Sequence, residues 1–443
     1  MVAEQSVGLS ITSMKICVYG LWHLGTVTAA CLANRGFEVV GLDPNTKTID
    51  GLNCGKAPLY EPGLDKHLES GLEAGRLTFT TDIKSAVGHT DIVWVTFDTP
   101  IDEDEKADID FVFDRIIDTF SYLRDDTMII ISSQLPVGSI RKVEREFMEC
   151  KSDRRVSFCC IPENLRLGQA IESFLNPDRI VVGIRDNGMR PIIGRLLSPI
   201  SSELVWVGVE SAEMSKHALN AFLAMSIVYS NEIAGICERV NADSIEVENT
   251  LRTESRVGRS AYIRPGEAFS GGTLARDVTY LTNIADQENL QIPVLNSVVP
   301  SNNIQKGWLF RRAQEILGNS AQHKKVGVLG LSYKIGTDSI EKSISIELIR
   351  DLLTLGVQIS AFDPKVNILP KDLSMVRLEN SIDDVTVDAD LLIVATRWPD
   401  FQALSSETLI NNMRAPVVID QGAFLASGLS GESRIQYIAF GKG

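Results

Sequence analysis

Hydrophobic residues recur at helical spacing through residues 211–240, which read SAEMSKHALNAFLAMSIVYSNEIAGICERV. Apolar positions three and four apart, with no proline and one late glycine, predict a single long helix. Because its apolar content runs nearly all the way round, we expect this helix to be buried between other parts of the molecule. Lys216 and Asn220 lie four positions apart, so they share one face and can address the same ligand.

Short apolar runs alternate with helical patterns on both sides of this long segment. Before it, strands are predicted at residues 15–19, 37–42, 91–97 and 128–132, and a helix at residues 26–34. After it, strands are predicted at residues 324–333 (with a turn), 357–362, 390–395 and 416–419, and a helix at residues 344–355. Alternation of strand and helix is typical of α/β domains with parallel sheets.

The first strand leads into a glycine turn of the kind that binds dinucleotides. Residues 20–25 read GLWHLG, and the second strand ends on Asp43. In such a site the helix N-terminus receives the pyrophosphate and the acid accepts from the adenosine ribose hydroxyls. Gly20 and Gly25 fit this layout, but Trp22 stands where a glycine normally admits the phosphates, so its indole must point away or shift the cofactor. A glycine fingerprint alone is equally compatible with a structural turn.

The last part of the chain opens in the same way. Gly330 and Lys334 lie at its first turn, where a helix entrance can again receive a phosphate. The expected fold class is therefore α/β, with two Rossmann-like doubly wound parallel-sheet domains joined by a long central helix. We expect a flexible leader at residues 1–13, a first sheet domain at 14–205, a central helical region at 206–318 and a second sheet domain at 319–443.

Loops that follow the predicted strands should ring a bound cofactor, because open α/β sheets bind ligands at the carboxyl ends of their strands. Thr99 and Pro100 follow one strand, and Ser133 and Gln134 follow the next. Glu163 comes after a proline at a further strand end, where it can act as a base or as a surface cap.

A glycine-rich stretch follows the long helix, reading PGEAFSGGTLARD at residues 265–277. Its Ser-Gly-Gly run is the kind of flexible loop that lets main-chain amides close around a ligand. Thr273 and Asp277 are four apart at the start of the next helix, so both can face one pocket. The alternative is that Thr273 is an N-cap and Asp277 a first-turn acid.

Composition narrows the classes of partner. The net charge of −15 over 443 residues argues against nucleic acid or an anionic membrane surface, so an anionic substrate would need a local basic pocket. The seven cysteines are odd in number and show no metal spacing, and the acidic stretch at residues 102–110 suits a solvated loop, so we expect reduced thiols and no metal. No apolar run approaches ~20 residues and residues 1–13 lack signal-peptide features, so we expect a cytoplasmic chain without a membrane span.

Taken together, these stretches resemble the UDP-glucose/GDP-mannose dehydrogenase family from residue 15 to about residue 422. The motifs that carry the resemblance are GLWHLGTVTAACLANRGFEVVGLD, YEPGL, LPVGS, IPE, NPDRIVVG, EMSKHALNAF, RPGEAFSGG, GLSYK, FDP and ATRWPDF. The resemblance implies NAD in the first domain, the nucleotide of a UDP- or GDP-sugar in the last domain, and a homodimer built on the central helix. It also implies a double oxidation of a primary alcohol to a carboxylate, through a cysteine thioester, in polysaccharide biosynthesis.

The resemblance also assigns site residues. For the cofactor these are Gly20, Trp22, His23, Leu24, Gly25, Asp43, Thr99, Pro100, Ser133 and Gln134. For the substrate they are Glu163, Leu165, Lys216, Asn220, Arg256, Tyr262, Gly266, Ser270, Gly271 and Lys334, with Arg256 reaching into the neighbouring subunit's site. For catalysis they are Lys216, Asn220, Asp277, Thr273 and Glu163. The carboxylate of Asp43 favours NAD over NADP, because it would repel a 2′-phosphate.

Several departures fall on the residues that run the second oxidation. Thr273 stands at the family's catalytic cysteine, and a hydroxyl is a far poorer nucleophile than a thiolate. Arg276 replaces the neighbouring lysine, and Gln134 replaces a threonine near the reacting water. Two cations of the last domain are also missing, where the chain reads EKS at residues 341–343 and DQG at residues 420–422.

These departures leave four functions open. The chain can be an ordinary acid-forming dehydrogenase that tolerates Thr273, or an enzyme that stops after two electrons at a carbonyl. It can also return the hydride as a nucleotide-sugar epimerase, or bind a nucleotide sugar without catalysis.

Overall fold

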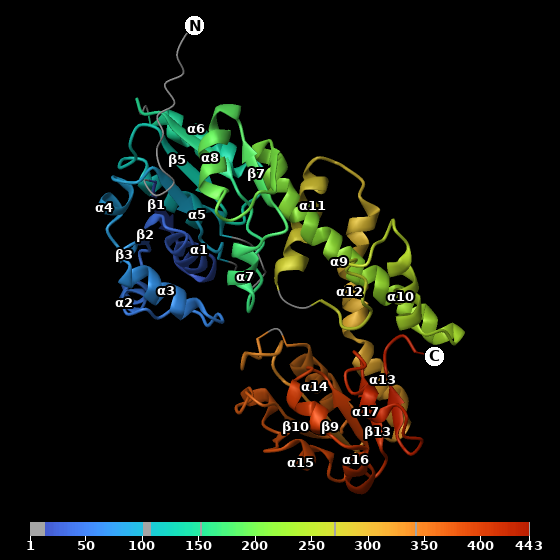
Figure 1. Ribbon diagram of the computed structural model, residues 1–443. Coiled ribbons are helices and arrows are strands. Elements are labelled where there is room, and N and C mark those ends of the chain that lie inside the picture. The colour runs from blue at the N-terminus through green and yellow to red at the C-terminus, as the bar shows by residue number, and fades with distance from the viewer. Residues whose placement is uncertain (1–13, 101–107, 151–152, 270–271, 342, 443) are drawn as a thin grey trace. The chain divides into compact units, whose positions relative to one another are not determined.

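The computed structural model describes residues 14–100, 108–150, 153–269, 272–341 and 343–442 (Figure 1). The leader expected at residues 1–13, most of the acidic stretch at 102–110, and the substrate-binding residues Ser270 and Gly271 lie outside the described residues. The chain divides into two compact units, Met1–Leu219 and Asn220–Gly443.

The first unit is built on a sheet in the order β3-β2-β1-β4-β5-β6-β7-β8, parallel except between β6 and β7. Its first six strands follow the order of the Rossmann fold, with the topological switch between β1 and β4. The strands are β1 (Lys15–Tyr19), β2 (Glu38–Leu42), β3 (Leu77–Thr80), β4 (Ile92–Val95), β5 (Thr127–Ile131), β6 (Val156–Cys160), β7 (Ile180–Ile184) and β8 (Leu204–Val207).

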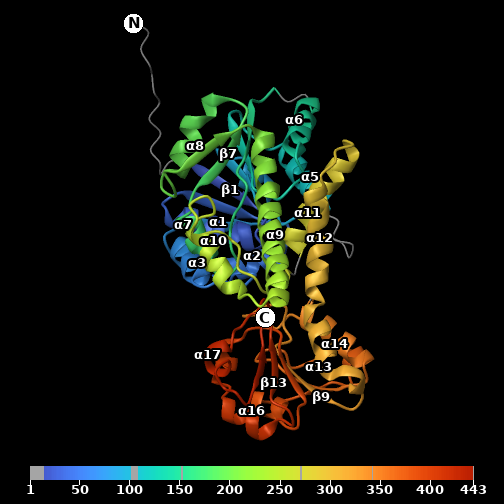
Figure 2. The ribbon, with the colours of Figure 1, turned by 90° about the vertical axis from the view of Figure 1, so that its right-hand side faces the viewer.

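Helices cover both faces of this sheet (Figure 2). They are α1 (His23–Asn34), α2 (Thr46–Asn53), α3 (Leu64–Glu73), α4 (Ile83–Val87), α5 (Ile109–Thr119), α6 (Ser139–Glu149), α7 (Ala170–Leu175) and α8 (Arg190–Leu197). Alternate residues of β1 enter different cores. Ile16 and Val18 pack on the side of α1 and α3, whereas Cys17 and Tyr19 pack on the side of α5 and α6. A strand covered on both faces is apolar throughout, which is why these runs were recognisable in the sequence.

The second unit contains an all-parallel sheet in the order β11-β10-β9-β12-β13-β14, which repeats the Rossmann order with its switch between β9 and β12. Its strands are β9 (Lys325–Leu329), β10 (Gln358–Phe362), β11 (Arg377–Leu378), β12 (Leu391–Val394), β13 (Val417–Asp420) and β14 (Gln436–Ile438). Its helices are α10 (Ser244–Thr253), α11 (Gly272–Gln287), α12 (Pro293–Lys306), α13 (Trp308–Leu317), α14 (Ile344–Thr354), α15 (Ile382–Thr386), α16 (Ser406–Asn412) and α17 (Ala426–Leu429). The expected fold class is confirmed.

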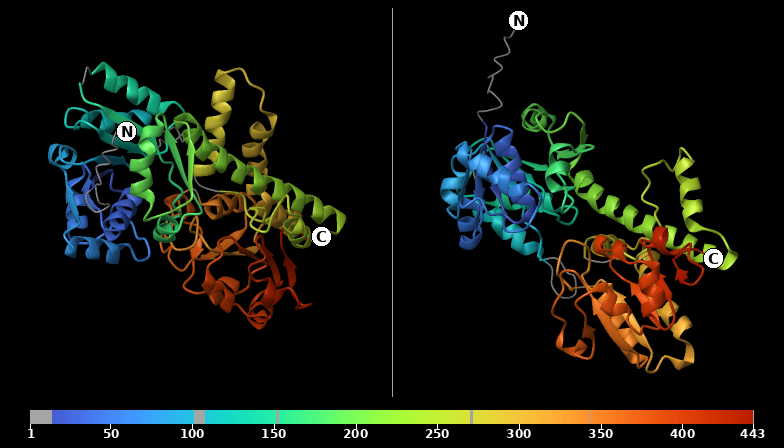
Figure 3. Two further views of the ribbon diagram at one scale, coloured as in Figure 1. Left: turned by 45° about the horizontal axis from the view of Figure 1, so that its top comes forward. Right: turned by 60° about the horizontal axis from the view of Figure 1, so that its bottom comes forward.

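The long central helix, α9 (Val209–Val240), is continuous and starts two residues before the predicted start (Figure 3). In the second unit, α11 and α12 lie side by side against it. Ala221, Ala224 and Val228 of α9 form a small core with Val278 of α11 and Val298 of α12.

The prediction that α9 is buried all round is wrong for the described chain. Phe222, Tyr229, Ile236 and Val240 are 57%, 49%, 58% and 64% exposed and form one apolar stripe at helical spacing. An apolar pattern on a helix predicts that its surface is covered by other residues. It does not indicate whether those residues belong to the same chain or to a second copy. Among the described helices, α9 alone has the length and composition of a membrane span, a test that core helices of soluble proteins also pass.

The glycine turn is shorter than predicted, because α1 begins at His23 and not at Thr26. Gly25 therefore lies inside the helix, where an added Cβ would come within 1.8 Å of the main-chain oxygen of Gly20. Glycine is required at position 25 because α1 packs closely against the turn. An interpretation of Gly25 as a helix breaker conceals this role.

Candidate active site

The turn after β1 is held so tightly that only glycine fits its first position. Gly20 has a φ of +99°, and a Cβ there would lie 2.8 Å from the main-chain nitrogen of Phe97. Phe97 follows β4, so the turn lies against the neighbouring strand end at the switch point of the sheet. Ligands of open α/β sheets bind at this point.

Asp43 sits beside the same turn and is 9% exposed. Its Oδ2 accepts from the N–H of Leu21 at 2.7 Å, and its Oδ1 accepts from the N–H of Asn45 at 2.9 Å. A carboxylate offers about four acceptor positions, so Asp43 can hold the turn and still accept from ribose hydroxyls.

The N-terminus of α1 is open to an anion. Trp22 occupies the N-cap position with φ −81° and ψ −146°, a negative φ that does not require glycine, and no side chain caps the helix. Its indole is 48% exposed, as expected if it points away from the turn. Uncapped amides at the start of a helix bind phosphate, so the residues around the turn fit the pyrophosphate of a dinucleotide.

His23, the first residue of α1, forms a hydrogen bond that sequence reasoning missed. Its Nε2 lies 2.9 Å from Oε2 of Glu61, a side chain that also accepts from the N–H groups of Gly168 and Ala170 at 2.8 Å each. Burial acts to raise the pKa of Glu61, but these hydrogen bonds outweigh it and hold the pKa below its ordinary value. Glu61 lies in the YEPGL motif, and only the fold reveals that it ties its own loop and the segment at Gly168–Ala170 to the cofactor turn.

A cavity of about 20 Å³ brings four of the predicted site residues together at the carboxyl ends of β5 and β6. Its lining includes Ser133, Gln134, Glu163 and Lys216. The hydroxyl of Ser133 is buried and has no partner among the described residues, which leaves it available to a ligand. The hydroxyl of Thr99 donates a hydrogen bond to the main-chain oxygen of Gln134, one of the lining residues, at 2.7 Å.

Glu163 fixes the predicted catalytic lysine. Nζ of Lys216 lies 2.8 Å from the main-chain oxygen of Glu163 and 3.2 Å from its Oε1. The other carboxylate oxygen, Oε2, accepts from the N–H of Leu165 at 2.8 Å. A second cavity of about 80 Å³ is lined by Glu163, Leu165 and Leu24 of α1, so the cofactor turn and the Glu163 loop border one space.

The second unit contains the other half of the predicted catalytic set. Asn220 of α9 donates a short hydrogen bond from Nδ2 to Oδ2 of Asp277, which is 1% exposed. Thr273 is exposed near the start of α11. Because α11 begins at Gly272, Thr273 lies within the first turn, so its reading as an N-cap is wrong.

The loop that leads into α11 is anchored by amide side chains. Gly266 donates its N–H to Oδ1 of Asn231 at 2.8 Å and accepts from Nε2 of Gln305 at 2.8 Å. Asn302 binds both the N–H and the oxygen of Phe269 at 2.9 Å. The described part of the loop is therefore set by α9 and α12.

Four further predicted residues that the structure describes do not line either of these two cavities. Pro100 is exposed, and its oxygen accepts from the N–H of Asp108. Arg256 is exposed and ion-paired to Glu254 at 3.0 Å, and Tyr262 is 59% exposed. Lys334 is half-buried beside the ring of Tyr333.

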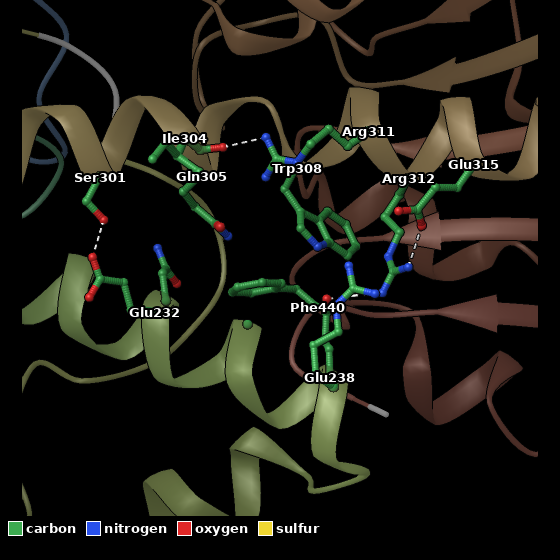
Figure 4. A pocket seen from close by; sticks show the side chains of 13 residues that line it. Glu232, Glu238, Ser301, Ile304, Gln305, Trp308, Arg311, Arg312, Glu315 and Phe440 are labelled. Carbon is green, nitrogen blue, oxygen red and sulfur yellow. Dashed lines mark hydrogen bonds and ion pairs between the residues drawn. The ribbon is translucent and has the colours of Figure 1, made fainter.

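A cavity of about 220 Å³ opens between α9 and the α12–α13 pair (Figure 4). Its charged side chains are largely matched with one another: Arg312 pairs with Glu238 and Glu315, and Glu232 accepts from Ser301. None of the described residues predicted to bind cofactor or substrate lines it.

An open, mostly parallel sheet with a glycine turn, an uncapped helix N-terminus and a carboxylate at its switch point is typical of a dinucleotide-binding α/β domain. The chain matches the UDP-glucose/GDP-mannose dehydrogenase family along most of its length: the NAD binding domain over residues 14–201, the central domain over residues 210–304 and the UDP binding domain over residues 327–427. The chain belongs to this family. It is an NAD-dependent oxidoreductase that acts on CH–OH groups.

Individual relatives agree with this assignment. The chain is 31% identical over 414 residues to a UDP-glucose 6-dehydrogenase of Rhizobium meliloti, covering 92% of this chain and 94% of that protein. It is 31% identical over 412 residues to the UDP-glucose 6-dehydrogenase TuaD of Bacillus subtilis, covering 92% and 88%. The solved UDP-glucose dehydrogenase of Pyrobaculum islandicum matches with a TM-score of 0.83 and 26% identity over 99% of both chains.

Proposed function

We propose that this chain oxidises one hydroxyl of a UDP-sugar to a carbonyl with NAD and stops after two electrons. In this reaction the C–H bond breaks with its electron pair, the hydroxyl proton leaves to a base or to water, and a C=O bond forms. NAD, when bound, accepts the hydride. The residues proposed to hold it are Gly20, Trp22 and Asp43 at the turn, with Thr99 and Ser133 at the neighbouring strand ends.

The observation that carries the proposal is the lack of an activated thiol in the described active-site region. A second oxidation through an acyl intermediate needs a thiolate, and Thr273 offers only a hydroxyl. The cysteine that lines the Lys216 cavity is Cys160. Burial, and then the charges of Glu213 and Cys159, raise the pKa of its thiol well above its ordinary value, so it is a poor nucleophile.

The retained side chains suit the first oxidation. Lys216 is held by Glu163 at the cavity that Ser133 and Gln134 also line, where an ammonium would stabilise a developing alkoxide. In the second unit, Asp277 is buried and accepts from Asn220, which fixes a carboxylate able to accept a proton. We assign Lys216 to charge stabilisation and Asp277 to proton transfer.

UDP-glucose is the substrate to test first, because the chain matches the family's UDP binding domain and its relatives include UDP-glucose 6-dehydrogenases. The purified protein is mixed with NAD and a panel of UDP- and GDP-sugars, reduced nicotinamide is counted per sugar consumed, and the product is weighed. One reduced nicotinamide and a carbonyl product support the proposal. Two with a carboxylate establish the acid-forming reaction instead, an isomer without net reduction identifies an epimerase, and no turnover with any sugar identifies a non-catalytic relative.

We also propose that the chain is a homodimer built on α9. The support is the exposed stripe formed by Phe222, Tyr229, Ile236 and Val240, since monomeric soluble proteins rarely leave a long apolar stripe uncovered. A second copy of the same helix would cover it symmetrically.

A further inference from the structure

The second sheet carries an arginine at its own switch point. Arg397 follows the end of β12, and its neighbour Thr396 lies against the glycine turn after β9. A Cβ on Gly330 would be 2.6 Å from the main-chain nitrogen of Thr396, and the hydroxyl of Thr396 donates to the oxygen of Ser332 at 2.8 Å. Arg397 therefore stands at the edge where a sheet of this order binds its ligand.

One side of the guanidinium of Arg397 is already engaged. Its Nε lies 3.0 Å from Oε1 of Glu267, and its Nη2 lies 3.1 Å from Oε2, which is a two-point ion pair. Glu267 belongs to the loop that leads to Thr273 and Asp277. A single side chain thus connects the carboxyl edge of the second sheet to the loop that positions the catalytic residues.

The other side of the guanidinium faces open space. Arg397 is 47% exposed, and no protein partner is seen for its Nη1 among the described residues. A guanidinium has five N–H donors in a planar fork, so a group that holds one carboxylate can hold a second anion along its other edge.

Glycine at position 422 keeps this second edge clear. A Cβ on Gly422 would come within 3.1 Å of Cδ and 3.2 Å of Nη1 of Arg397. The guanidinium therefore lies where a side chain at residue 422 would extend, although the two residues follow different strands. Arg397, which follows β12, thus brings a cation to the space beside residue 422.

We infer that the free edge of Arg397 binds the diphosphate of the nucleotide sugar while its other edge holds Glu267. This rests on the proposed nucleotide-sugar substrate and adds the residue that recognises its phosphates. Substrate binding at the second sheet and the position of the active-site loop are thereby joined through one guanidinium. In a chain of net charge −15, such a cation is what a doubly charged phosphate ligand requires.

The test is calorimetric binding of UDP and of uridine to the full chain and to three variants. We expect Arg397→Lys to raise the Kd of UDP about tenfold or more and to leave the Kd of uridine unchanged. Lysine keeps the positive charge but cannot bind Glu267 and a phosphate at the same time through paired N–H donors. Gly422→Ala, which pushes on Nη1, should raise the Kd of UDP by about threefold or more. Glu267→Gln should leave UDP binding within about threefold while it lowers kcat, because it loosens the loop and spares the phosphate edge.

The matched control is Arg414→Lys, which changes an exposed arginine paired with Asp388 and Asp390 near the opposite edge of the same sheet. It should leave UDP binding unchanged, and every variant should bind NAD like the unaltered chain. Equal UDP affinity in Arg397→Lys and the unaltered chain overturns the inference alone. If the unaltered chain binds NAD but not UDP, the proposed substrate class fails and the inference fails with it.

Discussion

The ammonium of Lys216 lies 2.8 Å from the main-chain oxygen of Glu163 and 3.2 Å from its carboxylate, so one residue holds the lysine by two contacts. Removing the charge should therefore slow the chemistry more than it disturbs the fold. We expect Lys216→Met to lower kcat by about 10²–10³, the usual effect of losing one group that stabilises a developing oxyanion. Steady-state kinetics check this, with the exposed Lys84→Met as control, and an active Lys216→Met enzyme would exclude the lysine from the reaction.

In the proposed reaction, the hydroxyl of Thr273 limits the chain to a single oxidation. Thr273→Cys restores a thiol at the start of α11 and should raise the yield from one reduced nicotinamide per sugar to two, with a carboxylate product. Thr273→Ser keeps a hydroxyl and should remain at one. Product mass and nicotinamide stoichiometry measure both, and a yield of two from the serine variant would rule out the role assigned to the thiol.

In the cofactor turn, position 20 requires glycine and position 22 does not. Gly20→Ala places a Cβ against the main chain of Phe97 at a φ of +99°, and should cost about 1–3 kcal/mol of stability and most of the NAD affinity. Trp22→Gly removes an exposed indole from an N-cap with negative φ, and should change the Kd of NAD by less than about threefold. Calorimetry with NAD distinguishes them, and a large gain in affinity for Trp22→Gly would mean that the indole obstructs the phosphates.

The loop that Glu61 holds should loosen in acid. The pKa of the Glu61 carboxyl is lowered in the folded chain. Glu61 therefore stabilises the fold fully above its ordinary pKa of 4.5, and this contribution is lost as the pH falls toward the lowered pKa of the folded chain. Hydrogen exchange of the Gly168 and Ala170 amides, corrected for intrinsic rates, should lose protection over that range. Glu61→Gln should lose about 1–3 kcal/mol of protection at pH 7 and show no further loss in acid. Unchanged protection in the variant would contradict this account.

The exposed stripe of α9 should be an interface. Ile236→Asp should convert a dimer into monomers at micromolar concentration, because it would bury an unpaired charge within the proposed contact. Met375→Asp is the control, since Met375 is 81% exposed in the second unit and away from the stripe. Light scattering measures both, and an unaltered chain that is monomeric would exclude the interface.

Much of the fold was readable from the sequence because its strands are apolar on both faces and its turns contain glycine. Residues 15–19 form β1 as predicted, and the long helix was placed to within two residues. Parallel strands bury both faces, so their sequence signal survives without any knowledge of their neighbours. Element ends were less certain, and α1 begins at His23 because Gly25 packs against the turn rather than ending it.

Only the tertiary structure decided which polar residues work together. His23 and Glu61 are 38 positions apart and Glu267 and Arg397 are 130 apart, and no local pattern joins either pair. Local sequence determines the helix or strand propensity of a segment and the spacing of its buried residues. A polar contact between distant loops depends instead on how the strand ends converge. The sequence by itself therefore determined two Rossmann-like domains and the glycine turn of the NAD-binding domain. The tertiary structure decided that Glu163 holds Lys216, and that Arg397 lies beside Gly422.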